Sequence, residues 1–99
     1  MSDFTKEDTE IKIKEILQAK LDIPIESIYS ESNLSEDLGV DSIDVLEVGY
    51  QIEESFGIKL NDFEEMLHIK TLDDFSTFIY TKYQMNNLDN MSNEDSNVD

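Results

Sequence analysis

Residues 36–60, which read EDLGVDSIDVLEVGYQIEESFGIKL, decide the fold of this chain. Asp41 is a good helix N-cap, and Asp44 follows three positions later, which is a carboxylate variant of the capping-box spacing. Gly57 is a residue type that commonly ends helices. The stretch therefore predicts a helix that begins after Asp41 and stops before Gly57. Its apolar positions are Ile43, Leu46, Ile52 and Phe56, with Val45 and Val48 beside them.

Upstream of this helix the sequence predicts another helix and then a long connection. Ile13 and Leu17 stand at helical spacing in a helix over residues 5–20, and Pro24 ends that helix. Residues 21–40 then form a connection whose length is unusual in a small domain and is often functional. Its apolar residues predict that it packs across the helices; they are Ile25, Ile28, Tyr29, Leu34 and Leu38.

Downstream, two further helices are expected. A short one covers residues 62–68, where Phe63, Met66 and Leu67 are apolar, and Thr71 can cap a fourth helix that ends near Tyr83. No stretch shows the alternation of a strand. The predicted fold class is all-α, a small four-helix bundle with three longer helices, one short helix and a long loop between the first two. The inward residues of the fourth helix are Leu72, Phe75, Phe78 and Ile79.

The chain divides into one helical domain over residues 1–83 and a tail over residues 84–99. Eleven of the sixteen tail residues are Asn, Asp, Glu or Ser, and the apolar ones show no period, so we expect a disordered acidic tail. With 99 residues, of which 38% are hydrophobic, the chain can bury one small core. No apolar run approaches the roughly 20 residues needed to span a bilayer.

The charge of the chain excludes several classes of partner. Seven lysines and no arginine stand against 24 acidic residues, for a net charge of −17. Nucleic acids and anionic membrane surfaces attract Lys and Arg, so we expect neither as a partner. Partners should instead present basic patches, unless the excess acid only keeps the protein in solution. The chain has no cysteine and therefore no disulfide and no thiolate metal site. The default expectation for its location is the cytoplasm, and we expect a monomer.

Ser42 is the candidate for chemistry. It places a hydroxyl in the first turn of a helix, directly after the acidic cap Asp41. Backbone N–H groups are unpaired there and the helix dipole favours negative charge, so a phosphate ester on this hydroxyl would be stabilised. Most serines at helix starts are simple capping residues, so the position alone does not establish a modification.

The segment from Glu36 to Leu60 resembles the acyl carrier protein family, whose signature is Asp-Ser-Leu or Asp-Ser-Ile at the start of the second helix. The likeness extends from EIKIKEILQAKLDIPIESI, residues 10–28, through Phe78-Ile79, and covers about three quarters of the chain. The resemblance implies that Ser42 is the attachment point for 4′-phosphopantetheine, transferred from coenzyme A by a phosphopantetheinyl transferase. It also implies that an acyl group is carried as a thioester on that arm.

The resemblance further implies two surfaces for partners and cargo. Asp41 would cap the helix and help to dock the transferase. Acyl-loading and acyl-processing enzymes with basic patches would dock on Asp37, Asp44, Glu47, Tyr50, Glu53 and Glu54. The acyl chain would lie against Leu46, Ile52, Phe56, Met66, Leu67, Ile69 and Leu72. The spacing of the acidic residues also suits a solvated helix face, and the spacing of the apolar residues also suits an ordinary core. Tyr50 could equally contact a partner, shield the acyl chain or be buried in the core.

The predicted function is therefore acyl carriage for fatty-acid or related polyketide or specialised lipid biosynthesis. Nothing near Ser42 in the sequence could activate it, and the single histidine, His68, lies far along the chain, so we expect a carrier and not an enzyme. The alternatives are an aminoacyl or peptidyl carrier and a carrier-like interaction module that is never loaded. A calcium-binding EF-hand is excluded because its loop spacing is missing.

Gly49 departs from the pattern of the family, which usually has an aliphatic residue there. Glycine inside a helix costs about 1 kcal/mol relative to alanine. We expect the missing side chain to make room, either for a large neighbour such as Tyr50 or for an unusual acyl group. His68 falls in a third-helix region that is one residue longer than usual, and a lone histidine is more often a surface or packing residue than a functional one.

Overall fold

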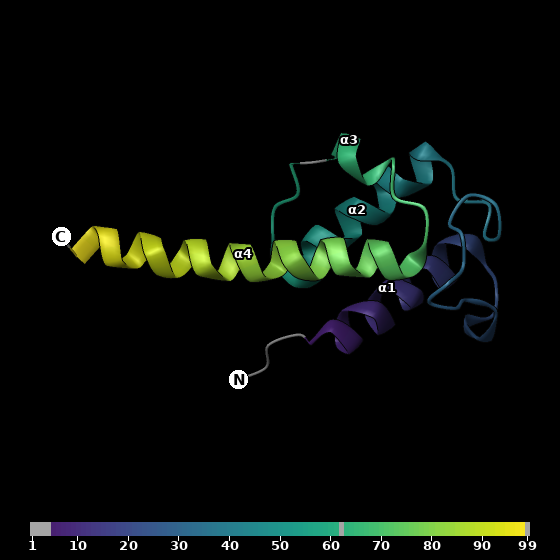
Figure 1. Cartoon of the computed structure of the whole chain (residues 1–99), viewed down its shortest axis with the longest axis horizontal. Coiled ribbons are helices and arrows are strands. Elements are labelled where there is room, and N and C mark those ends of the chain that lie inside the picture. Colours follow the sequence, from purple (N-terminus) through teal and green to yellow (C-terminus); the bar gives the residue numbers. More distant parts are fainter. Residues whose placement is uncertain (1–4, 62, 99) are drawn as a thin grey trace.

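The computed structural model describes the backbone of residues 5–61 and 63–98, and the side chains of residues 5–61 and 63–86. Within these residues the fold is helical, and the one β contact is an isolated bridge between Asn33 and Thr71. This confirms the predicted class, with three longer helices and a short one (Figure 1). The elements are α1 (Lys6–Leu21), the 3-10 turn η1 (Ile25–Ser27), α2 (Ser42–Phe56), α3 (Phe63–Met66) and α4 (Leu72–Val98).

Side-chain caps define where the helices begin. Thr5 Oγ1 accepts a hydrogen bond from the Asp8 amide at 3.0 Å, and the Asp8 carboxylate accepts one from the Thr5 amide at 3.2 Å. At the start of α4, Thr71 Oγ1 accepts from the Asp74 amide at 3.1 Å, as predicted. Each bond satisfies an amide that the helix itself leaves unpaired.

The core lies where α1 packs against both α2 and α4. In α2 the buried face consists of Val45, Val48, Ile52 and Phe56, which recur at intervals of three or four residues. Ile43, one of the apolar positions of the predicted helix, does not belong to this face and is 64% exposed. At about 100° per residue, Ile43 falls on the opposite side of the helix from Ile52. The other helices contribute Ile13, Leu17, Met66, Leu72, Phe75 and Ile79 to the core.

The long connection packs across the helices, as expected. Ile28 and Leu34 are buried in it, although Tyr29 is exposed. Backbone hydrogen bonds tie the connection to the start of α4: the Leu34 amide donates to the Lys70 carbonyl at 2.7 Å and the Leu72 amide to the Ser32 carbonyl at 3.0 Å. The connection is thereby held against the start of α4.

Two helix boundaries differ from the prediction. α3 covers only Phe63–Met66, so Leu67 and His68 lie in the turn that follows it. α4 was expected to end near Tyr83, yet it continues to Val98 and extends away from the bundle (Figure 1). The sequence beyond Tyr83 contains no proline or glycine to stop a helix. Tyr83 is the last buried side chain among those described, and a domain boundary at residue 83 stays a prediction.

Candidate functional site

Ser42 is the first residue of α2 and its side chain is exposed. The predicted capping box precedes it: Asp41 Oδ1 accepts from the Asp44 amide at 2.9 Å, and Asp44 Oδ2 accepts from the Asp41 amide at 3.3 Å. Gly39 turns the chain into the helix with a φ of 73°, a left-handed conformation that favours glycine. The result is a hydroxyl presented on a fixed turn, open to another macromolecule.

A cleft of about 180 Å³ lies beside Ser42. Of the seven residues predicted to line an acyl pocket, Leu67 and Ile69 line this cleft. Ile52, Phe56, Met66 and Leu72 are instead buried in the core, and Leu46 is half-buried. Three residues that were not predicted as lining, Val45 of α2 and the loop residues Leu34 and Val40, complete the apolar wall of the cleft. Loop residues have no periodicity, so no sequence signal indicated which way they face.

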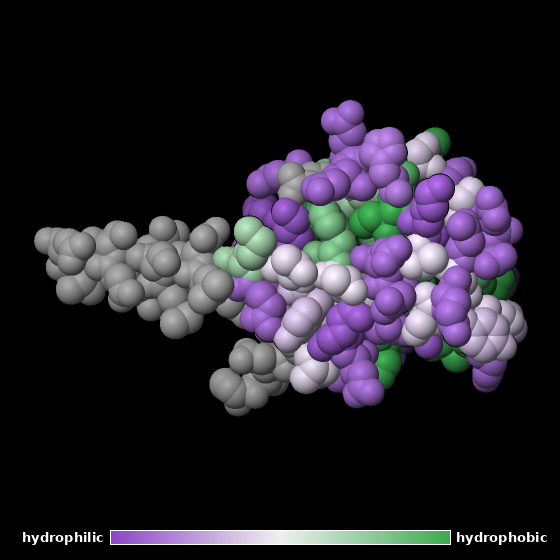
Figure 2. Space-filling model, viewed as in Figure 1, coloured by the Kyte–Doolittle hydropathy of each residue, from purple (hydrophilic) through white to green (hydrophobic). Residues whose placement is uncertain are grey.

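The predicted acidic docking residues separate into two groups in the structure. Asp37, Glu47 and Glu54 are exposed, whereas Asp44 and Glu53 are half-buried. Glu53 Oε2 accepts a hydrogen bond from the Leu60 amide at 2.6 Å, so it holds the segment that follows α2. Lys20 of α1 forms ion pairs with Asp44, at 3.9 Å, and with Glu47. Figure 2 shows that hydrophilic side chains cover most of the described surface on the viewed side.

Comparison with known proteins accounts for this arrangement. Residues 12–79 match the family described as phosphopantetheine attachment site. The acyl carrier protein of Buchnera aphidicola subsp. Acyrthosiphon pisum (strain 5A) is 40% identical over 73 residues, which are 74% of this chain and 90% of that protein. The acyl carrier protein of Wolinella succinogenes is 41% identical over 69 residues, covering 70% and 90% of the two chains. This chain belongs to the acyl carrier protein family. The prosthetic group of this family, covalent 4′-phosphopantetheine, is therefore its cofactor, and its role is to carry acyl groups.

The outer face of this carrier's α2 combines acidic and apolar side chains. We define it by four residues that recur at helical spacing, namely Ile43, Glu47, Tyr50 and Glu54. The Tyr50 side chain is 56% exposed, and its ring is tilted against the Phe63 ring with centroids 5.4 Å apart. Tyr50 is thus a surface residue and not a core tyrosine. Ile43 belongs to this surface although it is apolar, so its residue type gave no sign of its exposure.

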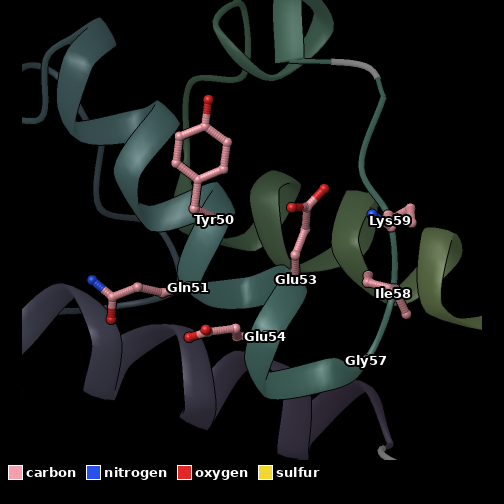
Figure 3. Close-up of a pocket in the computed structure, with 7 residues that line it drawn as sticks. All are labelled: Tyr50, Gln51, Glu53, Glu54, Gly57, Ile58 and Lys59. Atoms are coloured by element: carbon pink, nitrogen blue, oxygen red, sulfur yellow. The ribbon is translucent and has the colours of Figure 1, made fainter.

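An open hollow of about 570 Å³ lies along the C-terminal half of α2. Figure 3 shows Tyr50 and Glu53 pointing upward from α2, and Gln51 and Glu54 pointing to the left. Lys59, in the segment after Gly57, is also part of its lining. The hollow therefore offers a phenol ring and carboxylates next to the outer face.

Gly49 makes room for α3, which corrects the expectation that its neighbour is Tyr50. A Cβ at this position would lie 2.7 Å from Phe63 Cε1 and 3.1 Å from Met66 Cε. The first distance is shorter than real side chains tolerate, so a larger residue would force the Phe63 ring, or α3 with it, to shift. The glycine therefore allows a close contact between α2 and α3.

The remaining candidate features carry little chemistry. His68 is exposed in the turn after α3, where its amide donates to the Glu65 carbonyl at 3.1 Å. Over residues 5–61 and 63–86, no three His, Asp or Glu side chains are grouped to hold a metal ion. In the same described part of the chain, no helix combines the length and the hydropathy needed to cross a bilayer.

Proposed function

We propose that Ser42 Oγ is the attachment point for 4′-phosphopantetheine and that this chain carries acyl groups as thioesters on that arm. The observation that carries the proposal is the exposed hydroxyl at the start of α2, beside a cleft with an apolar wall, in a chain of the acyl carrier protein family. The first turn of α2 suits a phosphate diester, because its amides and dipole favour negative charge. When bound, the group supplies a thiol, which the chain itself lacks.

Loading requires a transferase that supplies the catalytic groups. No described side chain forms a hydrogen bond with Ser42 Oγ, so a base that removes its proton has to come from the partner. Ser42 then contributes only the oxygen nucleophile. Asp41 holds the start of α2 through the capping box and, in our proposal, also contributes to the surface on which the transferase docks.

Basic partner enzymes dock, in this proposal, on the outer face of α2 and on Asp37. The exposed carboxylates of Glu47 and Glu54 attract Lys and Arg side chains, while Ile43 and Tyr50 offer apolar area between them. Charges of this kind mainly raise the association rate and fix the orientation of a complex. Asp44 and Glu53 contribute to the negative potential, although each is also used inside the fold.

The cargo we propose belongs to fatty-acid or related polyketide or specialised lipid biosynthesis. The strongly acidic second helix and the identity to acyl carrier proteins support this choice over aminoacyl or peptidyl cargo. The proposal also includes a cytoplasmic, monomeric carrier with no catalytic activity of its own.

The test is intact-protein mass spectrometry after incubation with coenzyme A, Mg²⁺ and a broad-specificity phosphopantetheinyl transferase. We expect the full chain to gain one phosphopantetheine and Ser42→Ala to gain none. Ser35→Ala is the matched control, because Ser35 is another exposed serine in the wall of the same cleft, and it should load like the unaltered chain. Loading of Ser42→Ala would place the attachment elsewhere. An unloaded full chain, beside a loaded known carrier, would favour an interaction module.

A further inference from the structure

The start of α2 is paired with a lysine of the neighbouring helix. Lys20 lies in the last turn of α1, where the helix dipole favours a positive charge. Its Nζ forms ion pairs with the carboxylates of Asp44, at 3.9 Å, and of Glu47. These carboxylates stand two and five positions after Ser42. Lys20 therefore places a positive charge on the surface where we propose that basic partners dock.

Both carboxylates are already engaged within the chain. Asp44 uses Oδ1 for Lys20 and Oδ2 for the Asp41 amide, at 3.3 Å. The Lys20 side chain is only 26% exposed, so water and salt screen its ion pairs less than those of a fully exposed lysine. A basic side chain that approaches this end of α2 therefore meets carboxylates that have a positive partner.

The other end of the outer face of α2 differs in this respect. Glu54 is exposed, and none of the ion pairs formed among residues 5–61 and 63–86 includes it. Glu47 and Glu54 thus stand on the same face and carry the same charge, yet Lys20 pairs with Glu47 alone of the two. Lys20 therefore weakens the negative potential of α2 near Ser42, where the transferase has to act.

We propose that Lys20 restrains the docking of basic partners at the end of α2 that carries Ser42. The inference rests on the proposed function, since it concerns the enzymes that load and process the arm on Ser42. A partner's Lys or Arg that approaches Glu47 is repelled by Lys20 and has to share or take over its carboxylate. Specificity often needs such a repulsive element beside the attractive ones. Lys20 therefore slows loading below the rate that the carboxylates of Asp44 and Glu47 alone would support.

The experiment measures kcat/KM for phosphopantetheine loading of the full chain by a basic transferase, with mass spectrometry as the readout. Lys20→Met is the test variant, because methionine keeps the unbranched stem and the helix propensity of lysine and removes the charge. Lys14→Met is the matched control, since Lys14 is 25% exposed on the same helix and pairs with Glu10 at 3.7 Å. Both variants make the net charge more negative by the same amount.

We expect Lys20→Met to load about fourfold faster than the unaltered chain at low ionic strength, and Lys14→Met to load within about 1.5-fold of it. At about 1 M salt, where the Debye length is about 3 Å, the gain of Lys20→Met should disappear. Lys20→Arg keeps the charge and should load no faster than the unaltered chain. Both methionine variants should melt within about 4 °C of the unaltered chain, because ion pairs near the surface contribute little to stability.

The outcomes separate this inference from the proposed function. If no form of the chain loads under conditions that load a known carrier, the proposed function fails and the inference falls with it. If the unaltered chain loads and Lys20→Met gains no more than Lys14→Met, the inference alone is overturned. A gain that persists at about 1 M salt also overturns it, because the effect is then not one of charge. Where Lys20→Met does not fold, Lys20→Gln removes the same charge and decides by the same criteria.

Discussion

The inner and outer faces of α2 differ in which substitutions they tolerate. On the inner face, Val48 and Ile52 are almost completely buried, and Gly49 is in contact with α3. On the outer face, Glu47 and Glu54 are exposed. Substitutions on the inner face should therefore change stability, whereas substitutions on the outer face should change association with partners. Stability and association with partners therefore depend on residues on opposite faces of the same helix.

The largest expected effect comes from placing a larger residue at position 49 on the inner face. Gly49→Val should destabilise the fold by about 2–3 kcal/mol, because overpacking at Phe63 outweighs the roughly 0.3 kcal/mol of helix propensity that valine gains over glycine. In a domain of this size that lowers the melting temperature by at least about 8 °C. Gln51→Val is the control, since Gln51 is exposed on the same helix. Thermal and urea unfolding measure both variants.

The partner of Gly49 can be identified in the same way. If Phe63 is the residue that a new side chain strikes, Phe63→Leu in the Gly49→Val background should recover part of the lost stability. Unchanged stability of Gly49→Val alone would mean that α3 does not pack on the glycine.

The next largest effect should come from reversing charge on the outer face. We expect Glu47→Lys with Glu54→Lys to slow phosphopantetheine loading by about tenfold at low salt, because a basic transferase is then repelled. Stability should change by less than about 1 kcal/mol, since the ion pair between Lys20 and Glu47 is near the surface. Loading rates at two ionic strengths provide the measurement, and added salt should narrow the difference.

The control for charge reversal changes net charge equally on another helix. Glu7→Lys with Glu15→Lys alters two exposed residues of α1 and should leave the loading rate within about twofold. Equal slowing by both pairs would mean that total charge, and not the outer face, governs docking.

The features that could be predicted from the sequence are those that depend on neighbouring residues. The capping box of Asp41 and Asp44 and the stop at Gly57 were predictable because each depends on residues within one helical turn. The face of α2 was predicted less well, since Ile43 is apolar and only its position relative to α1 and α4 leaves it exposed. The contact of Gly49 with Phe63 joins residues 14 positions apart, so no local pattern could reveal it. The same holds for the cleft wall at Leu34 and Val40.

A smaller effect should separate two neighbouring carboxylates. Glu53→Ala removes the hydrogen bond from the Leu60 amide and should cost about 1–2 kcal/mol of unfolding free energy. Glu54→Ala changes the net charge by the same amount, yet its side chain is exposed and the change should stay within about 0.5 kcal/mol. Chemical denaturation of the two variants tests the difference. Similar losses would show that the bond to Leu60 does not hold the segment.

The smallest effect should come from shortening α4. Removal of residues 87–99 should change the free energy of unfolding by less than about 0.5 kcal/mol, because Tyr83 is the last buried side chain among those described. Four carboxylates leave with the segment, which slightly reduces charge repulsion in the chain. Tyr83→Ala gives the contrast. The Tyr83 ring packs edge-on against the Phe56 ring, with centroids 6.0 Å apart, and its removal should lower the free energy of unfolding by about 3 kcal/mol. A loss above 1 kcal/mol on shortening would mean that the end of α4 supports the bundle, and that the domain does not end near residue 83.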